Sequence, residues 1–183
     1  KNGQVLVSDL AALFQVSEET VRRDLRALEK EGLLRRDYGG ALLVQEAPRV
    51  PPLEERNLVR TVEKDRIGAA AAGLIGEARV VMLDAGSTTL HVARHLKDRQ
   101  GLTVVTNDLG IADELRGAQG VRVLVTGGQL KPHSRSLVGP DAVAAVRRYH
   151  ADIAFLGASG FTPERGFTTS DVLEAELKAT MIQ

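Results

Sequence analysis

The stretch from Val16 to Gly32 constrains the fold and the chemistry of this chain more than any other. Apolar residues recur in it at helical spacing and predict a buried stripe: Val21, Leu25 and Leu28. Basic residues recur on another face of the same helix: Arg22, Arg26 and Lys30, with Arg23 beside them. Ser17 is a good N-cap and Gly32 a natural helix end. The stretch therefore predicts an amphipathic helix with a strongly basic face.

A shorter helix is expected just before it, capped by Ser8, with apolar residues on one side: Leu10, Ala11, Leu13 and Phe14. Two short helices joined tightly, the second rich in arginine, are typical of a helix-turn-helix whose second helix enters a DNA major groove. The residues that follow predict a hairpin: a strand over 33–36, a turn over 37–40 and a return strand over 41–44. Such a wing would carry Arg35 and Arg36 to the phosphate backbone.

The alternative is an ordinary helical hairpin with a solvated charged face. Because cap, turn, apolar stripe and hairpin all agree, we favour binding to double-stranded DNA. The candidate DNA-binding residues lie on the second helix and the wing: Ser17, Glu18, Thr20, Arg22, Arg23, Arg26, Arg35 and Arg36.

Composition narrows the class of protein. The chain has 183 residues, no cysteine and 3% aromatic residues, which excludes disulfides and thiolate metal sites and disfavours single-strand binding by base stacking. No apolar run approaches the length of a membrane span, so we expect a cytoplasmic protein without membrane contact. Net charge is zero, and residues 1–44 carry seven Lys/Arg and seven Asp/Glu. This balance predicts weak non-specific DNA binding, with specificity and dimerisation making up the affinity.

The remainder predicts a proline-containing linker over 45–60 and an α/β domain from Thr61. A first helix should bury one face made of Ile67, Ala70, Ala71, Leu74 and Ile75. Four short apolar runs at 80–83, 102–105, 121–125 and 153–156 read as strands, and helices fit at 88–97, 109–116 and 140–149. This alternation predicts a mostly parallel sheet covered on both faces. Ligands bind such sheets at the carboxyl ends of the strands.

Polar and glycine residues follow all four strands, which favours a ligand cleft over ordinary polar loops. After the first strand, Gly86 and the hydroxyl residues Ser87, Thr88 and Thr89 precede a helix, as in an anion site; a plain helix cap is the alternative. The later strands end in Thr106-Asn107, Gly127-Gly128 and 157–160. Asp171, Glu174 and Lys178 share one face of a final helix, where spacing alone leaves open a ligand contact or a solvated face.

The chain resembles the DeoR family of bacterial transcriptional regulators. The resemblance rests on Val16-Ser17-x-x-Thr20-Val21-Arg22-Arg23-Asp24-Leu25, on 28–36 and on Gly39-Gly40-Ala41, and in the second half on 84–89, Thr106-Asn107, Gly127-Gly128 and 171–178. It implies a winged helix-turn-helix over 1–44, a linker over 45–60 and a sensor domain over 61–183. Because Asn2-Gly3 is a plausible helix end and 181–183 fall inside a helical pattern, we expect the first domain to lack its first helix and the sensor domain to be truncated at its C-terminus. The implied fold of the sensor is similar to ribose-5-phosphate isomerase and the CoA transferases.

The same resemblance implies a repressor of a sugar-metabolism operon that responds to a phosphorylated sugar, without a cofactor, as a homo-oligomer (dimer or tetramer). It also implies the effector contacts: Asp84, Ser87, Thr88, Thr89, Asn107, Gly128, Asp171, Glu174 and Lys178. Gly86, Thr106 and Gly127, which also follow strands, complete the candidate effector-binding set. Ligand binding would change how sensor domains pair and hence the spacing of the DNA-reading helices. The sugar, the operator, the oligomeric state and repression versus activation stay open.

Two other functions are alternatives to a transcriptional regulator: an enzyme and a scaffold. A sugar-phosphate isomerase fused to a helix-turn-helix is the alternative, with Glu174 as base, but the acidic stretch of that enzyme is replaced by Leu156-Gly157-Ala158-Ser159-Gly160, so we expect no enzyme. A scaffold without ligand or DNA is disfavoured by the arginines. His91 and His95 have the spacing of a metal pair, but no third ligand is near in sequence, so we expect no metal.

Overall fold

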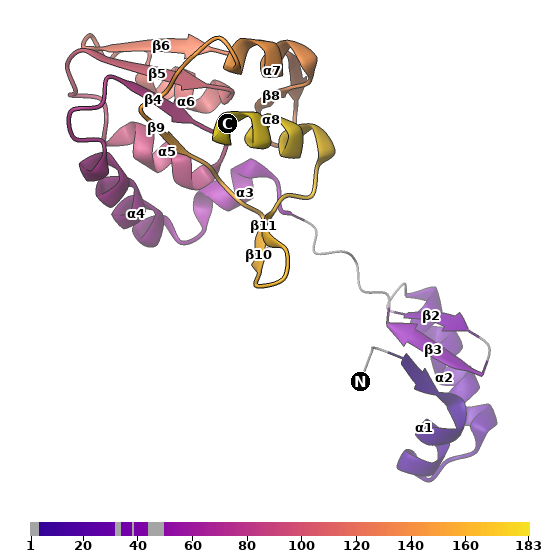
Figure 1. The fold of residues 1–183 in the computed structure, drawn as a ribbon. Coiled ribbons are helices and arrows are strands. Elements are labelled where there is room, and N and C mark those ends of the chain that lie inside the picture. The colour runs from indigo at the N-terminus through magenta and orange to yellow at the C-terminus, as the bar shows by residue number, and fades with distance from the viewer. Residues whose placement is uncertain (1–3, 32–33, 38, 44–49) are drawn as a thin grey trace. The chain divides into compact units, whose positions relative to one another are not determined.

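The computed structural model describes residues 4–31, 34–37, 39–43 and 50–183, and the chain divides into two compact units, Lys1–Arg49 and Val50–Gln183 (Figure 1). Three predictions lie outside the described residues: the helix end at Gly32, the ends of the two wing strands at Leu33 and Val44, and the linker over 45–49. Each unit is described by itself.

The first unit has the predicted helix pair and hairpin, with one additional strand. Its elements are β1 (Gln4–Leu6), α1 (Val7–Phe14), α2 (Glu18–Lys30), β2 (Leu34–Asp37) and β3 (Gly40–Leu43). The three strands form an antiparallel sheet in the order β1-β3-β2. Gly40 allows β1 to approach, because a Cβ at this position would meet the carbonyl O of Val5 at 2.1 Å. The sequence pattern missed β1, which is only three residues long.

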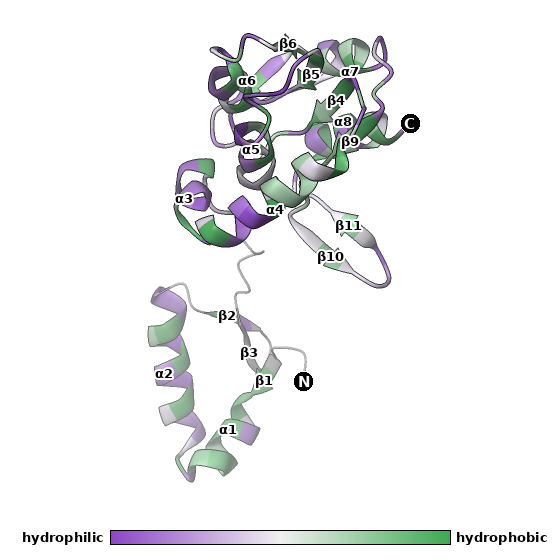
Figure 2. Ribbon diagram, turned by 90° about the vertical axis from the view of Figure 1, so that its left-hand side faces the viewer, coloured by the Kyte–Doolittle hydropathy of each residue, from purple (hydrophilic) through white to green (hydrophobic). Residues whose placement is uncertain are grey.

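Ser17 caps α2 as predicted, its Oγ accepting a hydrogen bond from the N–H of Thr20 at 3.2 Å. α2 is amphipathic and carries both colours along its length in Figure 2. α1, in contrast, begins at Val7 without a side-chain cap, so the prediction of Ser8 as cap is wrong. The chain runs directly from β1 into α1, and the N–H of Val7 is bonded instead to the carbonyl O of Gly39 at 3.0 Å.

The core of this unit is small. On α2 it extends only to Leu25, whereas the predicted apolar stripe continues to Leu28. The core consists of Val7, Val21, Leu25, Leu34 and Ala41. Leu28 is 38% exposed, and Leu13 and Phe14 of α1 are 72% and 66% exposed. The predicted buried stripe of α2 is therefore confirmed for Val21 and Leu25 and wrong for Leu28.

The second unit is built on a parallel sheet, which confirms the predicted α/β class. Its strands are β4 (Val80–Leu83), β5 (Leu102–Thr106), β6 (Val121–Val125) and β9 (Ile153–Phe155), in the order β6-β5-β4-β9. All three pairings are parallel. Leu83 is in register with both Thr106 and Phe155, so three strands end at the same level.

Helices cover both faces of this sheet (Figure 1). Alternate residues of β4 divide between two cores: Val81 and Leu83 pack with α4 (Thr61–Leu74), α5 (Ser87–Arg94) and α6 (Leu109–Leu115), whereas Met82 packs with α7 (Pro140–Val146) and α8 (Val172–Ile182). Burial on both faces explains why the strands read as continuous apolar runs. α5, α6 and α7 end one to three residues before the predicted ends.

The buried face of α4 differs from the prediction. Ala71 and Ile75 are buried, but Ile67 is 52% and Leu74 is 73% exposed, and Ala70 is exposed as well. The reason is a close approach of α4 to α5: a Cβ at Gly68 would lie 2.7 Å from the backbone C and O of His91. Small side chains therefore face α5, and the larger apolar residues are displaced to the outer side of α4.

Part of the predicted linker is folded. α3 (Leu53–Leu58) lies within the second unit, with Leu53 buried and its N–H bonded to the carbonyl O of His133 at 3.0 Å. Two short antiparallel pairs were also missed: β7 (Gln129–Lys131) with β8 (Ser136–Val138), and β10 (Gly160–Thr162) with β11 (Gly166–Thr168). Within the described residues, none of the helices has the length and apolar character needed to cross a bilayer.

Candidate functional site

A cavity of about 250 Å³ lies at the carboxyl ends of β4 and β9. Its walls include 85–89, which follow β4, and Gly157 and Ala158, which follow β9. In the strand order β6-β5-β4-β9, the chain leaves β4 toward β5 on one side and returns to β9 on the other. This reversal is the point at which open α/β sheets bind ligands.

The N-terminus of α5 forms the floor of the cavity. Its N-cap is Gly86, which has no side chain to accept hydrogen bonds from the first turn. The first turn of a helix leaves backbone N–H groups without intrahelical acceptors, and the helix dipole makes this end positive. Ser87, Thr88 and Thr89 line the cavity, and the hydroxyl of Thr89 donates to the carbonyl O of Gly86 at 2.9 Å. This geometry suits an anion.

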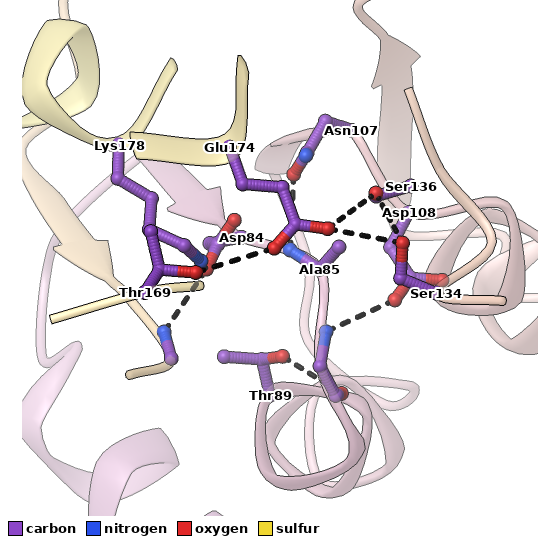
Figure 3. A network of polar contacts seen from close by, with 12 residues as sticks. Asp84, Ala85, Thr89, Asn107, Asp108, Ser134, Ser136, Thr169, Glu174 and Lys178 are labelled. Atoms are coloured by element: carbon purple, nitrogen blue, oxygen red, sulfur yellow. Dashed lines mark hydrogen bonds and ion pairs between the residues drawn. The ribbon is translucent and has the colours of Figure 1, made fainter. Parts of the chain in front are cut away.

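Glu174 of α8 also lines the cavity, and its carboxylate accepts hydrogen bonds from three hydroxyl groups (Figure 3). Its Oε1 accepts from Ser134 Oγ at 3.0 Å and Ser136 Oγ at 3.2 Å. Its Oε2 accepts from Thr169 Oγ1 at 3.4 Å. Carboxylate and hydroxyl groups arranged in this way can exchange hydrogen bonds with the hydroxyls of a polyol.

A buried ion pair joins β4 to α8. Asp84 is 2% exposed, and its Oδ2 accepts from Lys178 Nζ and, at 3.0 Å, from the N–H of Gly157. Burial raises the pKa of the Asp84 carboxyl above its usual value, while the Lys178 ammonium opposes that rise. Lys178 also lines the cavity, so its charge lies between Asp84 and any ligand bound there.

Two further cations line the cavity and were not among the predicted site residues: Arg56 of α3 and Lys64 of α4. Lys64 Nζ donates to the carbonyl O atoms of Arg56 and Val59. Burial, together with the neighbouring Arg56 charge, lowers the pKa of Lys64. Among the residues that the structure describes, no carboxylate forms an ion pair with either side chain. Arg56 lies in the segment predicted as a linker and Lys64 lies just after it. Neither follows a predicted strand, so the sequence pattern did not indicate them as site residues.

Six predicted effector contacts do not line the cavity. One is Asp84, and the other five lie in the structure around the cavity: Thr106, Asn107, Gly127, Gly128 and Asp171. Thr106 and Asn107 are fully buried. Thr106 Oγ1 accepts from the N–H of Asp108, and Asn107 Oδ1 accepts from the N–H of Ala85, each at 3.0 Å. These bonds fix the loop that carries the anion site.

The other three of these five residues shape neighbouring turns and a helix start. Asp171 caps α8 through the N–H of Glu174 at 3.0 Å and pairs with Lys131, which lowers the pKa of Asp171. Gly127 and Gly128 have φ values of 73° and 105°, which favour glycine. At Gly128 a Cβ would also meet the carbonyl O of Val138 at 2.6 Å.

Asp108 was not predicted, although it anchors the same loop. It is 1% exposed, and its carboxylate accepts from the N–H groups of Gly86 at 3.1 Å and Gly110 at 2.6 Å. Burial raises the pKa of Asp108. Because Asp is a common helix cap, its position before α6 was a usable signal.

In the first unit, the structure places the predicted arginines of α2 at the surface. The side chains of Arg22, Arg23 and Arg26 are 47%, 74% and 51% exposed. Arg35 and Arg36 lie within β2, not at its turn, because the strand pairing continues to Asp37 opposite Gly40. The Arg35 side chain is outside the described part of the structure.

His91 of α5 and His95, the C-cap residue of that helix, lie beside Asp65 of α4. His95 Nε2 is 2.9 Å and His91 Nδ1 is 3.7 Å from Asp65 Oδ1. Desolvation and the Arg94 charge lower the pKa of His91. In the described part of the chain, no group of three or more His, Cys, Asp or Glu side chains is arranged to hold a metal ion.

Removing the cation from the buried pair should destabilise the second unit strongly. We expect Lys178→Met to lower the free energy of unfolding by about 3–5 kcal/mol, because Asp84 is left buried without its partner. Urea unfolding followed by circular dichroism measures this. Lys97→Met, which removes an exposed ion pair with Glu114, should cost no more than about 1 kcal/mol.

The double variant Asp84→Asn/Lys178→Met tests whether the two side chains act as a pair. It should be less destabilised than Lys178→Met alone, because no buried charge is then uncompensated. Strictly additive losses would contradict this account of the pair.

Comparisons with known proteins agree with this domain pattern. The family model of the DeoR-like helix-turn-helix domain matches residues 1–47, and the model of the DeoR C terminal sensor domain matches residues 59–183. A putative aga operon transcriptional repressor of Escherichia coli O157:H7 is 38% identical over 185 residues, covering 100% of this chain and 69% of that protein. The transcriptional repressor AccR of Agrobacterium fabrum is 37% identical, covering 97% of this chain and 69% of that protein.

A third relative is the HTH-type transcriptional regulator GolR of Listeria innocua, which is 35% identical over 97% of this chain and 70% of its own length. A solved O-methyltransferase family protein from Burkholderia thailandensis covers 98% of this chain and 66% of its own, but at 16% identity and a TM-score of 0.31 it supports no conclusion about the fold. The two family models and the identity to full-length regulators show that the chain belongs to the DeoR family of transcriptional regulators.

Proposed function

We propose that this chain represses a sugar-metabolism operon by binding operator DNA through α2 and the wing, and that a phosphorylated sugar in the cavity at the end of β4 controls this binding. The observation that carries the proposal is the cavity itself, which is lined by the N-terminus of α5, by the cations Arg56 and Lys64, and by the carboxylate of Glu174. Two of the relatives above are named as repressors, which supports the direction of regulation.

The anion side supports recognition of a phosphate group. It combines the uncapped N-terminus of α5 with Arg56 and Lys64, whose hydrogen bonds go to neutral carbonyl oxygens. Their positive charges are therefore available to a ligand. Backbone N–H groups, hydroxyls and cations together are a common phosphate site. Glu174 at the other side suits sugar hydroxyls, and the two sides together favour a phosphorylated sugar over a free one.

The environment of Glu174 also argues against an isomerase. A general base needs a carboxylate free to take a proton from the substrate. Both Glu174 oxygens already accept hydrogen bonds from Ser134, Ser136 and Thr169, so neither oxygen is without a donor from the protein itself. We therefore propose a site that binds without reacting. Weak non-specific DNA affinity, expected from the neutral first unit, supports action as a homo-oligomer.

One phosphorylated sugar should stabilise the protein in a thermal-shift panel of phosphorylated and free sugars, and its free sugar should not. At 100 times the dissociation constant the ligand would add about 2.7 kcal/mol of stability. Lys64→Met should abolish most of this shift, because it removes a charge at the cavity. The matched control is Lys97→Met, which removes a lysine that does not line this cavity. An unchanged shift in Lys64→Met would contradict the phosphate assignment.

Arg22→Ala should weaken binding to DNA by about 1–3 kcal/mol if Arg22 reads a base. The probe is a duplex that the wild-type chain has selected from a random pool, measured by fluorescence anisotropy. Arg116→Ala removes an arginine 83% exposed on the second unit and should leave DNA affinity unchanged. Equal losses in the two variants, or none in Arg22→Ala, would exclude Arg22 as a reading residue.

A further inference from the structure

Each arginine of α2 is paired with a carboxylate of the same helix. Arg22 Nη2 is 2.5 Å from Glu18 Oε2, and Arg22 Nη1 is 3.8 Å from Glu19 Oε2. Arg26 Nη1 is 3.5 Å from Glu19 Oε1. Glu19 therefore lies between two arginines one turn apart, with one carboxylate oxygen directed to each.

This charge pairing contrasts with the contacts of two cations in the second unit. Arg56 and Lys64 donate to neutral carbonyl oxygens. On α2 the arginines face carboxylates, and the first 44 residues have equal numbers of acidic and basic side chains. The surface that must meet a polyanion is thus locally neutralised by its own side chains.

Such pairing should act differently on the two kinds of DNA binding. Non-specific binding comes from contacts between cations and phosphates and from the release of counterions. An arginine that must first break an ion pair with a carboxylate therefore gains less free energy from a phosphate contact. A base-reading arginine instead forms two hydrogen bonds to guanine, which offset the loss of the ion pair at the correct sequence. The pairing therefore weakens binding to wrong sequences more than binding to the right one.

Direct base reading by Glu19 is the competing explanation, because a carboxylate can accept from the amino group of cytosine. Glu19 lies in the first turn of α2, the end from which recognition helices contact bases. However, each of its two oxygens is already directed to an arginine. We propose that Glu19 is a specificity-determining residue that acts through Arg22 and Arg26 and lowers non-specific DNA affinity. This inference rests on the DNA-binding function proposed above.

The test compares wild type, Glu19→Gln and Glu31→Gln on two probes: a random-sequence duplex and the duplex selected by the wild-type chain. Glu31 is exposed at the other end of α2 and forms no ion pair among the described residues, so its variant matches the change in net charge. Glu19→Gln should bind the random duplex about 2- to 5-fold more tightly, the gain expected from releasing exposed ion pairs. Its affinity for the selected duplex should rise less, so the specificity ratio falls.

Because the expected result is a gain of binding, partial unfolding of the variant cannot imitate it. An equal gain in Glu31→Gln would show an effect of net charge alone and overturn the proposal. Loss of selected-duplex binding in Glu19→Gln with random-duplex binding unchanged would show base reading and overturn it as well, as would no change on either probe. If the wild-type chain enriches no sequence, the DNA-binding function fails together with this inference.

Discussion

The parallel pairing of β4 with both β5 and β9 is the constraint on which the candidate site depends. Since Leu83 is level with Thr106 and Phe155, the residues that follow these strands meet at one edge. Asp84, Asn107 and Gly157 are thereby brought together from positions far apart in the sequence, and Asp84 then holds Lys178 of α8. Asp108 binds the backbone of the loop before α5, and Asp84 binds Lys178. The Lys178 ammonium group and the N-terminus of α5 therefore face the same cavity.

The cations Arg56 and Lys64 of the second unit and the arginines of α2 differ in the groups that hold them. In the second unit, Arg56 and Lys64 are held by carbonyl oxygens, which position the cations without neutralising them. In the first, carboxylates one turn away hold the arginines of α2. The arrangement of Arg56 and Lys64 supports the proposed binding of a small anion. The pairing on α2 supports the proposed discrimination between DNA sequences, which suits a protein that must ignore most of the DNA it meets.

Strand bounds and a helix cap could be predicted from the sequence where the local pattern agrees with the tertiary structure. The bounds of β4 and β6 were predicted to the residue, because each is a short run rich in β-branched and apolar residues that is ended by polar residues. The cap at Ser17 followed from side-chain chemistry alone. Periodicity failed at α4, where a close approach to α5 selects the small residues Gly68 and Ala71 over Ile67 and Leu74.

The candidate site was predictable in part for the same physical reason. The residues directly after β4 were found because topology fixes where they lie. Arg56 and Lys64 were missed because they reach the cavity from α3 and α4, and which sheet edge a helix approaches depends on tertiary packing. Thr106 and Asn107 follow a strand as predicted, yet their side chains bind the backbone of the cavity wall.

The most direct test of the account is thermodynamic coupling between the cavity and DNA. The phosphorylated sugar that stabilises the protein is titrated in the presence and absence of the selected duplex, and the duplex is titrated with and without that sugar. The account predicts that each ligand changes the dissociation constant of the other by the same factor, on the order of 5- to 150-fold. A phosphorylated sugar that binds the cavity tightly and leaves DNA affinity unchanged would contradict it.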